Sequence, residues 1–505
     1  EQPFDEVLRQ YWEKNIYPLA GSEPGFGTWW NETLQRGTFE VGMTERPYSG
    51  ELSISKLRTA LESGAESMQG SVAGNEQGMT LTLYSSVGLS DGRHANNPWL
   101  QELPDPVTKV CWDNYLAVSV SDAEERGLKD EDVVMVNGMK APVLVQPGQA
   151  KGTCSLALGY GRTVAGKVGD YLGVNAYALV EERKGFRGYA IEDVVIEKTG
   201  EQYELARTQT HHSMEERPIV RETTLEEYKK DAYAGNHFHL EAEKHHGSMY
   251  PDVKTDGFHW GLAIDLNKCV GCNNCVVSCI AENNIATVGK QEVKNRRIMH
   301  WMRIDRYFSN DPENPKTSHQ PVMCQHCDNA PCENVCPVSA TLHSDEGLNQ
   351  VAYVRCIGTK YCINNCPYRV RRFNWYKYVN NDAFDYHMND EVGKMVLNPD
   401  VTVRSRGVVE KCSFCVQRIQ EKKMEAKLEN RELRDGEIQP ACVQSCPSGA
   451  LVFGNLNDQE AEVTKKMKEE RNYHLLEQLH TLPSVGYLTK VRNTEADEDE
   501  VDGIK

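Results

Sequence analysis

The cysteines of this 505-residue chain constrain its fold more than any other feature. There are 17 of them, and all except Cys111 and Cys154 lie between Cys269 and Cys446. Small disulfide-stabilised domains are short chains with cysteines spread throughout, so crowding in one part of a large chain is not their pattern. The dense region also holds an odd number, which leaves one thiol over in any scheme of paired disulfides. The sequence therefore divides into a cysteine-poor front and a cysteine-rich rear.

The dense region contains four cysteine groups. They are Cys269-x2-Cys272-x2-Cys275-x3-Cys279, Cys324-x2-Cys327-x4-Cys332-x3-Cys336, Cys356-x5-Cys362-x3-Cys366, and Cys412-x2-Cys415 with Cys442-x3-Cys446. The first has the spacing of bacterial ferredoxins, in which three thiolates hold one iron–sulfur cluster and the fourth cysteine ligates another. A tight loop can wrap three corners of a cubic cluster, while the fourth residue points away toward a second cube. Four such groups predict two ferredoxin-like pairs that hold four clusters.

The third group is one ligand short. In register with the first group, Thr359 stands where a cysteine is expected. A threonine hydroxyl is a poor iron ligand beside a thiolate, so the iron at that corner should be weakly held or absent. The ligand count then predicts three [4Fe-4S] clusters and one [3Fe-4S] cluster. A four-iron cluster with water or Thr359 at the fourth corner stays open, because ligand substitution in cluster sites is case-dependent.

Zinc is the general alternative for an array of CxxC motifs. Structural zinc takes four ligands around one ion, in two well-separated pairs. Three cysteines between Cys269 and Cys275 are too crowded for one tetrahedral ion, although a zinc-rich structural protein stays as an alternative from another class. The residues that follow the CxxC pairs are not histidine, which excludes covalent c-type haem on this chain; they are Asn273, Val276, Asp328 and Val416.

Composition narrows the possible partners. The formal net charge is -18, which argues against nucleic acid, because phosphate contacts need a basic surface. No uninterrupted apolar run approaches ~18 residues, so the sequence predicts no membrane-spanning helix. The chain begins Glu-Gln-Pro-Phe, with neither methionine nor a signal-peptide pattern, and we expect a processed product or the rear portion of a longer polypeptide.

Local patterns predict an α+β protein with five parts. Short β-type runs separated by turn residues are expected in the front, over 79–85, 115–120, 133–136, 141–145 and 155–158, with one short helix ending at Gly127. The first part is a helical segment over 1–78, with helices over 3–17 and 53–68, which we expect to be the end of a larger upstream domain. A β-rich domain over 79–204, a polar connector over 205–257 and the four-cluster domain over 258–456 follow. The last part, over 457–505, consists of a charged amphipathic helix (458–479) and an acidic tail (495–502).

Three other signals carry little weight. The run from Gly161 to Lys167 nearly matches a phosphate-binding loop, but Val168 follows and offers no hydroxyl to Mg²⁺. Cys111 and Cys154 are expected to be buried small apolar residues. Four connector histidines lack acids or cysteines at ligand spacing and are interpreted as solvated linker; they are His237, His239, His245 and His246.

At this point the chain resembles a known family. Its cysteine-rich half resembles the four-cluster electron-transfer subunits of the molybdopterin oxidoreductase superfamily, as in dimethyl sulfoxide and polysulfide reductases. Its front, with the segments 95–105 and 112–115, resembles the C-terminal domain of that superfamily's catalytic subunit. Both pieces in one chain, with a three-iron site, resemble the iron–sulfur subunit of alternative complex III, a bacterial quinol:electron acceptor oxidoreductase.

The resemblance implies a double-psi β-barrel in front and a double bacterial-ferredoxin-like domain behind. It also implies that ligand sets cross between paired groups. The sets are site I (Cys269, Cys272, Cys275 and Cys446), site II (Cys412, Cys415, Cys442 and Cys279) and site III (Cys324, Cys327, Cys332 and Cys366), each for [4Fe-4S], and site IV (Cys356, Cys362 and Cys336) for [3Fe-4S], with Thr359 at the missing-ligand position.

The implied function is electron relay from quinol to an acceptor such as cytochrome c. The three-iron cluster is the natural first acceptor, and no catalytic acid or base is expected in this chain. Expected partners are polytopic quinol-binding membrane subunits and c-type cytochrome subunits, which would hold the chain peripherally at the periplasmic face of the bacterial inner membrane. No molybdenum cofactor is expected, and the loop Gly159-Tyr160-Gly161 would be a vestigial pterin contact. The alternative is an electron-transfer subunit of an active molybdopterin reductase.

Overall fold

The structure is a computed structural model of the chain. It describes residues 4–21, 24–39, 55, 78–183, 186–215, 217–237, 255, 257–309, 311–386 and 389–494. The chain forms two compact units, Glu1–Ala73 and Gly74–Lys505. Within the described ranges, no helix combines the length and the apolar character needed to cross a membrane.

The first unit is helical. Helix α1 (Phe4–Asn15) is followed by the 3₁₀ helix η1 (Tyr17–Ala20) and by α2 (Phe26–Arg36), which confirms the helix predicted over 3–17. The Trp29 side chain is buried, and its ring lies 6.1 Å from that of Trp12, so aromatic contacts hold these helices together. The helix predicted over 53–68 lies outside the described residues, apart from Ser55.

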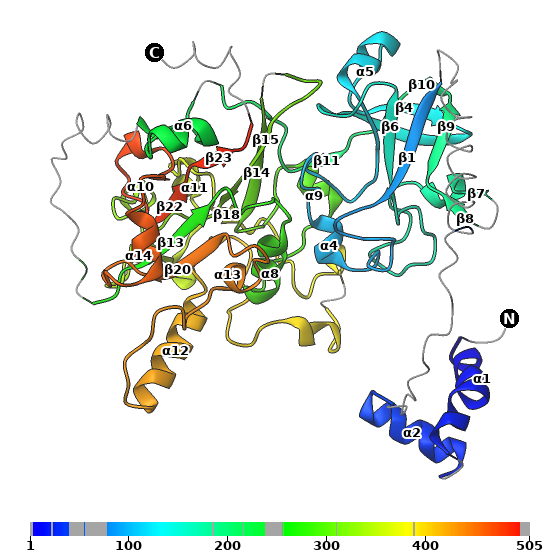
Figure 1. Cartoon of the computed structure of the whole chain (residues 1–505). Helices are drawn as coiled ribbons and strands as arrows, with labels where there is room; N and C mark the ends of the chain where they lie inside the picture. Colours follow the sequence, from blue (N-terminus) through cyan, green and yellow to red (C-terminus); the bar gives the residue numbers. More distant parts are fainter. Residues whose placement is uncertain are drawn as a thin grey trace. The chain divides into compact units, whose positions relative to one another are not determined.

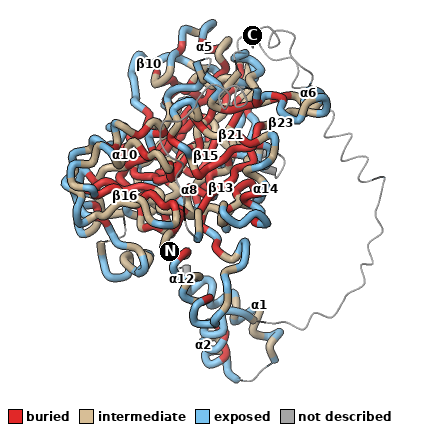
Figure 2. Tube along the Cα trace, turned by 90° about the vertical axis from the view of Figure 1, so that its left-hand side faces the viewer, coloured by how far each residue is buried: buried red, intermediate tan, exposed pale blue. Residues whose placement is uncertain are grey.

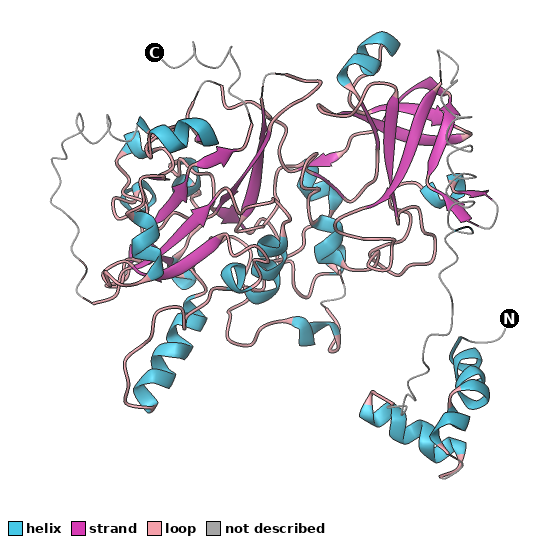
Figure 3. Ribbon diagram, in the orientation of Figure 1, coloured by secondary structure: helices cyan, strands magenta, loops and turns pink. Residues whose placement is uncertain are grey.

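The front of the second unit is a mixed seven-stranded sheet (Figures 1 and 3), in the order β10-β4-β5-β3-β6-β1-β9. Two of its pairs, β1–β6 and β3–β5, are parallel, and the others are antiparallel. The strands are β1 (Met79–Ser85), β3 (Leu116–Val118), β4 (Asp132–Val136), β5 (Met139–Val145), β6 (Thr153–Leu158), β9 (Ala190–Val194) and β10 (Ile196–Gln202). The five predicted strands are therefore confirmed, and their alternate apolar residues form the core of this sheet.

The predicted short helix is α5 (Val120–Arg126). Its N-terminus is capped by the Ser119 side chain, which accepts from the Asp122 backbone N–H. Gly127 ends the helix with φ 63°, a left-handed conformation that glycine adopts at low cost.

The rear of the second unit is built around a four-stranded sheet in the order β20-β13-β22-β21. Every residue of β13 (Trp260–Asp265) is buried, and Figure 2 shows this strand in the buried interior. Its neighbours are β20 (Leu451–Asn455), which is antiparallel to it, and β22 (Val485–Leu488), which is parallel. This part also contains three two-stranded antiparallel sheets: β14 (Arg303–Phe308) with β15 (Thr317–Val322), β16 (Thr341–His343) with β17 (Asn349–Val351), and β18 (Arg372–Phe373) with β19 (Val409–Glu410).

A short helix carries cysteines of each group. These helices are α8 (Asn274–Glu282), α10 (Pro331–Asn334), α11 (Tyr361–Asn364) and α13 (Ala441–Gln444). Helix α8 packs against α13, and α10 packs against α11. The first cysteine group is therefore paired in space with the fourth, and the second with the third. Helix α12 (Val416–Leu428), within the spacer of the fourth group, projects from this part of the structure (Figure 1).

The prediction of a single helix over 458–479 is wrong. Only α14 (Glu462–Met467) forms, and the chain then continues as β21 (Asn472–Tyr473), η6 (Glu477–Leu479), β22 and β23 (Lys490–Arg492). The physical reason is that the apolar side chains of Tyr473 and Leu475 alternate in the manner of a strand and are buried in the core of the central sheet. The acidic tail lies outside the described residues.

Part of the expected connector is packed on the protein. Strand β11 (Ala206–Arg207) pairs with β2 (Val110–Cys111), and β12 (Glu222–Thr224) pairs with β23. Between them the Arg221 guanidinium, which is buried, lies 4.5 Å from the centre of the Tyr473 ring. Helix α6 (Leu225–Lys230) follows, with a capping box at its start. Of the four connector histidines, His239, His245 and His246 lie outside the described residues.

The seven-stranded front is joined to the cysteine region by direct contacts. Helix α4 (Pro98–Glu102) packs against α8, and the Glu102 carboxyl accepts hydrogen bonds from the backbone N–H groups of Val288 (3.0 Å) and Gly289 (2.8 Å). Burial raises the pKa of Glu102 to about 8. The Asn273 amide, within the first cysteine group, donates to the Pro104 carbonyl at 2.8 Å. The segment 95–105 therefore lies directly on a cysteine loop.

Candidate metal-cluster sites

Site II surrounds an enclosed cavity of about 360 Å³. All four of its predicted ligands, Cys279, Cys412, Cys415 and Cys442, line this cavity. The rest of its wall is mostly apolar and includes Leu262, Trp301, Met302, Met323 and Phe414. Burial raises the pKa of Cys279, and the neighbouring thiolates of Cys412, Cys415 and Cys442 raise it further. These thiols therefore lie close together in a mostly apolar environment, although Cys279 and Cys442 are 163 positions apart in the sequence.

Site IV surrounds a second cavity, of about 330 Å³. Its lining includes the three predicted ligands Cys336, Cys356 and Cys362, and Thr359 lies in the same wall. Thr359 and these three thiols therefore line one cavity. Cys336 and Cys356 are partly buried, as Cys412 and Cys442 of site II are, but the wall of this cavity also contains an exposed residue, Thr359.

The thiols of sites I and III are also brought together. Burial, and then the thiolates of Cys269, Cys272 and Cys446, raises the pKa of Cys275. In site III, burial raises the pKa of Cys327. The neighbouring thiolate of Cys324 raises it further, with smaller contributions from Cys366 and Cys332. The Cys446 thiol therefore lies near those of Cys269, Cys272 and Cys275, and the Cys366 thiol near those of Cys324, Cys327 and Cys332.

Backbone N–H groups point at several of these sulfur atoms. The donors are Ala340 to Cys336 (3.2 Å), Ala450 to Cys446 (3.3 Å), Val409 to Cys356 (3.4 Å) and Phe414 to Cys412 (3.4 Å). Hydrogen bonds to sulfur stabilise metal-bound thiolates and tune the reduction potential of a cluster. The donor set therefore fits iron–sulfur clusters, which when bound supply one-electron chemistry.

Within the described residues, no group of three or more His, Cys, Asp or Glu side chains could hold a metal ion. A cubic cluster places its thiolate ligands on separate iron atoms, whereas zinc takes all four ligands on one atom. All 17 cysteines fall within the described ranges, and all have free thiols.

The four sites form a series, in which each neighbouring pair is joined differently. Sites I and II share helix α8, which carries Cys275 of one site and Cys279 of the other, and the Cys275 thiolate acts on the pKa of Cys279. Cys275 and Cys279 are four residues apart, which is about one helical turn. One short helix therefore carries a ligand of each site, and the two sites are neighbours.

Sites II and III are joined by an aromatic stack. His326 lies between Cys324 and Cys327, and Phe414 lies between Cys412 and Cys415. Their buried rings are stacked, with centroids 3.9 Å apart and planes inclined by 23°. The Asn349 backbone N–H donates to His326 Nδ1 at 3.1 Å, which fixes the ring.

Sites III and IV are joined by the buried guanidinium of Arg371. It donates to Cys332 Sγ of site III at 2.9 Å and to Thr341 Oγ1 at 3.1 Å, and Thr341 lines the site IV cavity. Sequence reasoning missed Arg371, His326 and Phe414. The available signal was their position, because each lies within a cysteine group or five residues after one.

Three exposed apolar residues lie close in sequence to ligands of site IV, and one of them, Ile357, lines its cavity. Val354 is 100% exposed, Ile357 65% and Tyr361 56%, and all three flank ligands of this site in sequence. Monomeric proteins seldom leave contiguous apolar groups in water, and such a group marks an interaction surface. We call these three residues the site IV patch.

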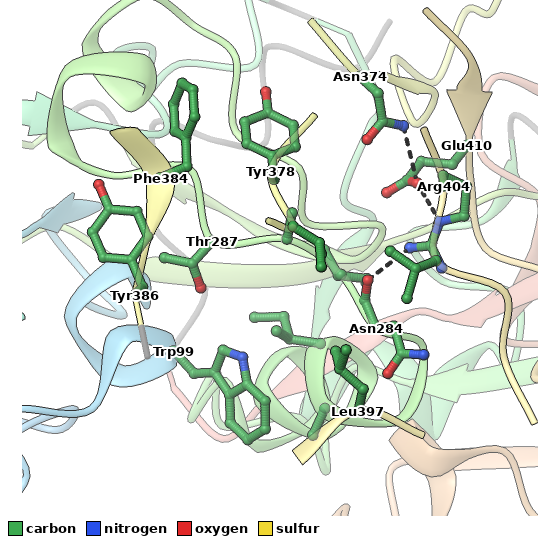
Figure 4. A pocket seen from close by; sticks show the side chains of 16 residues that line it. Trp99, Asn284, Thr287, Asn374, Tyr378, Phe384, Tyr386, Leu397, Arg404 and Glu410 are labelled. Carbon is green, nitrogen blue, oxygen red and sulfur yellow. Dashed lines mark hydrogen bonds and ion pairs between the residues drawn. The ribbon is translucent and has the colours of Figure 1, made fainter. Parts of the chain in front are cut away.

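A further cavity lies where the front of this unit meets the cysteine region (Figure 4). Its walls include the aromatic side chains of Trp99, Tyr378, Phe384 and Tyr386 and the buried ion pair of Arg404 with Glu410. The Glu410 carboxylate also accepts a hydrogen bond from Trp301 Nε1 at 3.1 Å, and Trp301 lines the site II cavity. None of the predicted ligands lines this cavity.

Two of the weaker sequence signals have structural explanations. Cys111 and Cys154 are 1% and 0% exposed, which confirms them as buried residues. In the near-match to a phosphate loop, Lys167 forms an ion pair with Asp385. A Cβ atom on Gly161 would lie 2.1 Å from the backbone nitrogen of Asn175, so this glycine permits a close approach of two chain segments.

Two ferredoxin-like pairs of cysteine groups, with thiols gathered around two cavities, define a multi-cluster iron–sulfur protein. Comparison with known families agrees: 4Fe-4S dicluster domains match residues 268–340 and 316–382. The chain is 40% identical over 238 residues to the menaquinone reductase iron–sulfur cluster-binding subunit of Nitratidesulfovibrio vulgaris, covering 46% of this chain and 89% of the relative.

Two further relatives come from other complexes. The Hdr-like menaquinol oxidoreductase iron–sulfur subunit 1 of Archaeoglobus fulgidus is 34% identical, covering 47% of this chain and 86% of the relative. The arsenate respiratory reductase iron–sulfur subunit of Shewanella sp. is 31% identical, covering 45% and 95%. The chain belongs to this family of electron-transfer iron–sulfur subunits of oxidoreductase complexes.

Proposed function

We propose that the chain relays electrons from quinol to an acceptor such as cytochrome c within a membrane-bound respiratory complex of the alternative complex III type. The observation that carries the proposal is the serial arrangement of four thiol sets, which ends at a site with three thiols and an exposed apolar patch. Relatives of the cysteine region include subunits named for menaquinone reductase and menaquinol oxidoreductase, which supports a quinone-linked role.

In this proposal sites I, II and III each hold a [4Fe-4S] cluster and site IV a [3Fe-4S] cluster. The chain's own residues fix the spacing of the clusters, exclude water and donate hydrogen bonds to sulfur. The site IV patch would contact an apolar subunit that presents quinol, so that the three-iron cluster is the first acceptor. Partner subunits would include polytopic quinol-binding proteins and c-type cytochromes, at the periplasmic face of the inner membrane.

We also propose that the mixed front sheet is a double-psi β-barrel without a molybdenum cofactor. Its two parallel strand pairs within an otherwise antiparallel sheet support this assignment. The second candidate is an electron-transfer subunit of an active molybdopterin reductase, which the relatedness to selenate and tetrathionate reductase subunits favours.

Metal analysis of the isolated native complex tests these proposals. We expect about 15 irons per chain, from the cluster types above, with sulfide and without zinc or molybdenum. Electron paramagnetic resonance of the oxidised complex should show a three-iron signal, because the oxidised [3Fe-4S] cluster is paramagnetic. Bound pterin in a partner would favour the molybdopterin reductase, whereas co-purifying c-haem subunits would favour our proposal. Colourless, iron-free material would exclude both.

A further inference from the structure

The side chain that separates sites III and IV is a buried cation. Arg371 is 3% exposed and precedes strand β18. One terminal nitrogen, Nη2, donates to Cys332 Sγ and to Asn349 Oδ1, each at 2.9 Å. The other, Nη1, donates to Thr341 Oγ1 at 3.1 Å. Three anchors therefore fix the plane of the guanidinium, which makes its position a property of the fold.

The guanidinium faces both thiol sets. Besides its contact with Cys332 of site III, it donates to Thr341, which lines the site IV cavity together with Cys362. In the described part of the chain, Arg371 forms no ion pair with a carboxylate, so cysteine sulfur supplies its counter-charge.

Two other buried cations near the thiol sets are arranged differently. The Arg404 guanidinium is neutralised by the Glu410 carboxylate. The Lys411 ammonium donates to the backbone carbonyls of Asn349 and Cys412. Arg371 thus differs from both in donating directly to cysteine sulfur.

A fixed cation beside a thiolate favours the state with more negative charge. Reduction adds one electron to a cluster, so a charge-assisted hydrogen bond to a ligand sulfur stabilises the reduced form and raises the reduction potential. The effect is strong in a buried site, where water does not screen the charge. A guanidinium that donates to a ligand of one site and to the cavity wall of the next acts on both clusters at once.

We infer that Arg371 is a positioning residue shared by sites III and IV, which raises the reduction potentials of both bound clusters. The inference rests on the proposed ligand sets. It makes these two sites the high-potential end of the series, suited to accept electrons from a relatively oxidising donor. It also predicts a joint response: removal of one side chain changes two potentials.

The test is a redox titration of the isolated complex, followed by electron paramagnetic resonance, with iron analysis of each sample. For Arg371→Met, we expect the three-iron potential and one four-iron potential to fall, while the other two stay unchanged. Arg371→Lys keeps the charge but cannot make the three-way anchor, so both potentials should fall by less. The control is Arg369→Met, two residues earlier and exposed, which should change no potential.

The possible outcomes distinguish failure of the inferred role of Arg371 from failure of the proposed ligand sets. Wild-type complex without clusters refutes the ligand assignment itself. If the clusters are intact and Arg371→Met changes neither potential, or only one, the shared role is refuted. If Arg371→Met loses iron, Arg371→Lys decides: a smaller joint fall supports the inference, and unchanged potentials overturn it.

Discussion

Sites II and IV have cavities of nearly equal size but opposite surroundings. Site II has four thiols and an apolar wall that includes Trp301 and Phe414, both nearly inaccessible to solvent. Site IV has three thiols and an exposed threonine, beneath the site IV patch. A buried cluster is suited to relay within the protein, whereas a cluster near the surface is suited to exchange with a partner. The comparison teaches that, of these two sites, the one with fewer thiols is also the one whose wall contains an exposed residue.

The largest expected difference concerns folding. Cys279→Ser removes a ligand from the centre of the main core, so it should cost about 4 irons and lower the midpoint of thermal unfolding by roughly 5–10 °C. Cys356→Ser should lose the iron of site IV with little change in the midpoint, because this ligand lies near the surface. Iron analysis and circular dichroism melting measure both. Equal losses of thermal stability would contradict the contrast between the two sites.

The next variant should convert site IV from a three-thiol site into a four-thiol site. Thr359→Cys supplies the missing thiolate, so iron should rise by about one per chain and the oxidised three-iron signal should disappear. Thr359→Ser is the matched control, because it keeps a hydroxyl at this position and should retain the signal. Iron analysis and electron paramagnetic resonance are the measurements. An unchanged signal in Thr359→Cys would mean that the threonine does not occupy a ligand position.

A smaller effect is expected at the site IV patch. Ile357→Glu introduces a charge into the proposed contact with an apolar partner, so quinol-dependent reduction of the complex should slow by about tenfold or more. The matched control is Val270→Glu, because Val270 follows Cys269 as Ile357 follows Cys356, and their exposures are 64% and 65%. Both variants should keep their iron and change stability by less than about 0.5 kcal/mol. Equal slowing by the control would refute the patch as the contact surface.

The 4Fe-4S dicluster character of the cysteine region could be predicted from the sequence because cysteine spacing is a local pattern. Cys269 to Cys279 is a single loop and helix, and the position of Thr359 follows from register alone. Strands such as β1 were predicted for a similar reason, since their two-residue alternation is local.

The helix over 458–479 was predicted wrongly because a tertiary partner overrides local charge patterning. Tyr473 and Leu475 are buried by the central sheet, whose other strands come from residues far away in the chain. Arg371 and the His326–Phe414 stack were missed for the same reason. Their neighbours belong to other cysteine groups, and no spacing rule brings those groups together.

The smallest expected effect tests how far hydrogen bonds tune the buried site. Asn283 Nδ2 lies 3.7 Å from both Cys279 Sγ and Cys415 Sγ, which makes two long, weak hydrogen bonds. If each contributes on the order of 0.5 kcal/mol, Asn283→Leu should lower the site II potential by about 20–40 mV. Asn284→Leu is the neighbouring control, because the Asn284 amide donates to backbone carbonyls instead of sulfur. A redox titration in which both variants shift the potential equally would show that loop packing, rather than hydrogen bonding to sulfur, sets the value at site II.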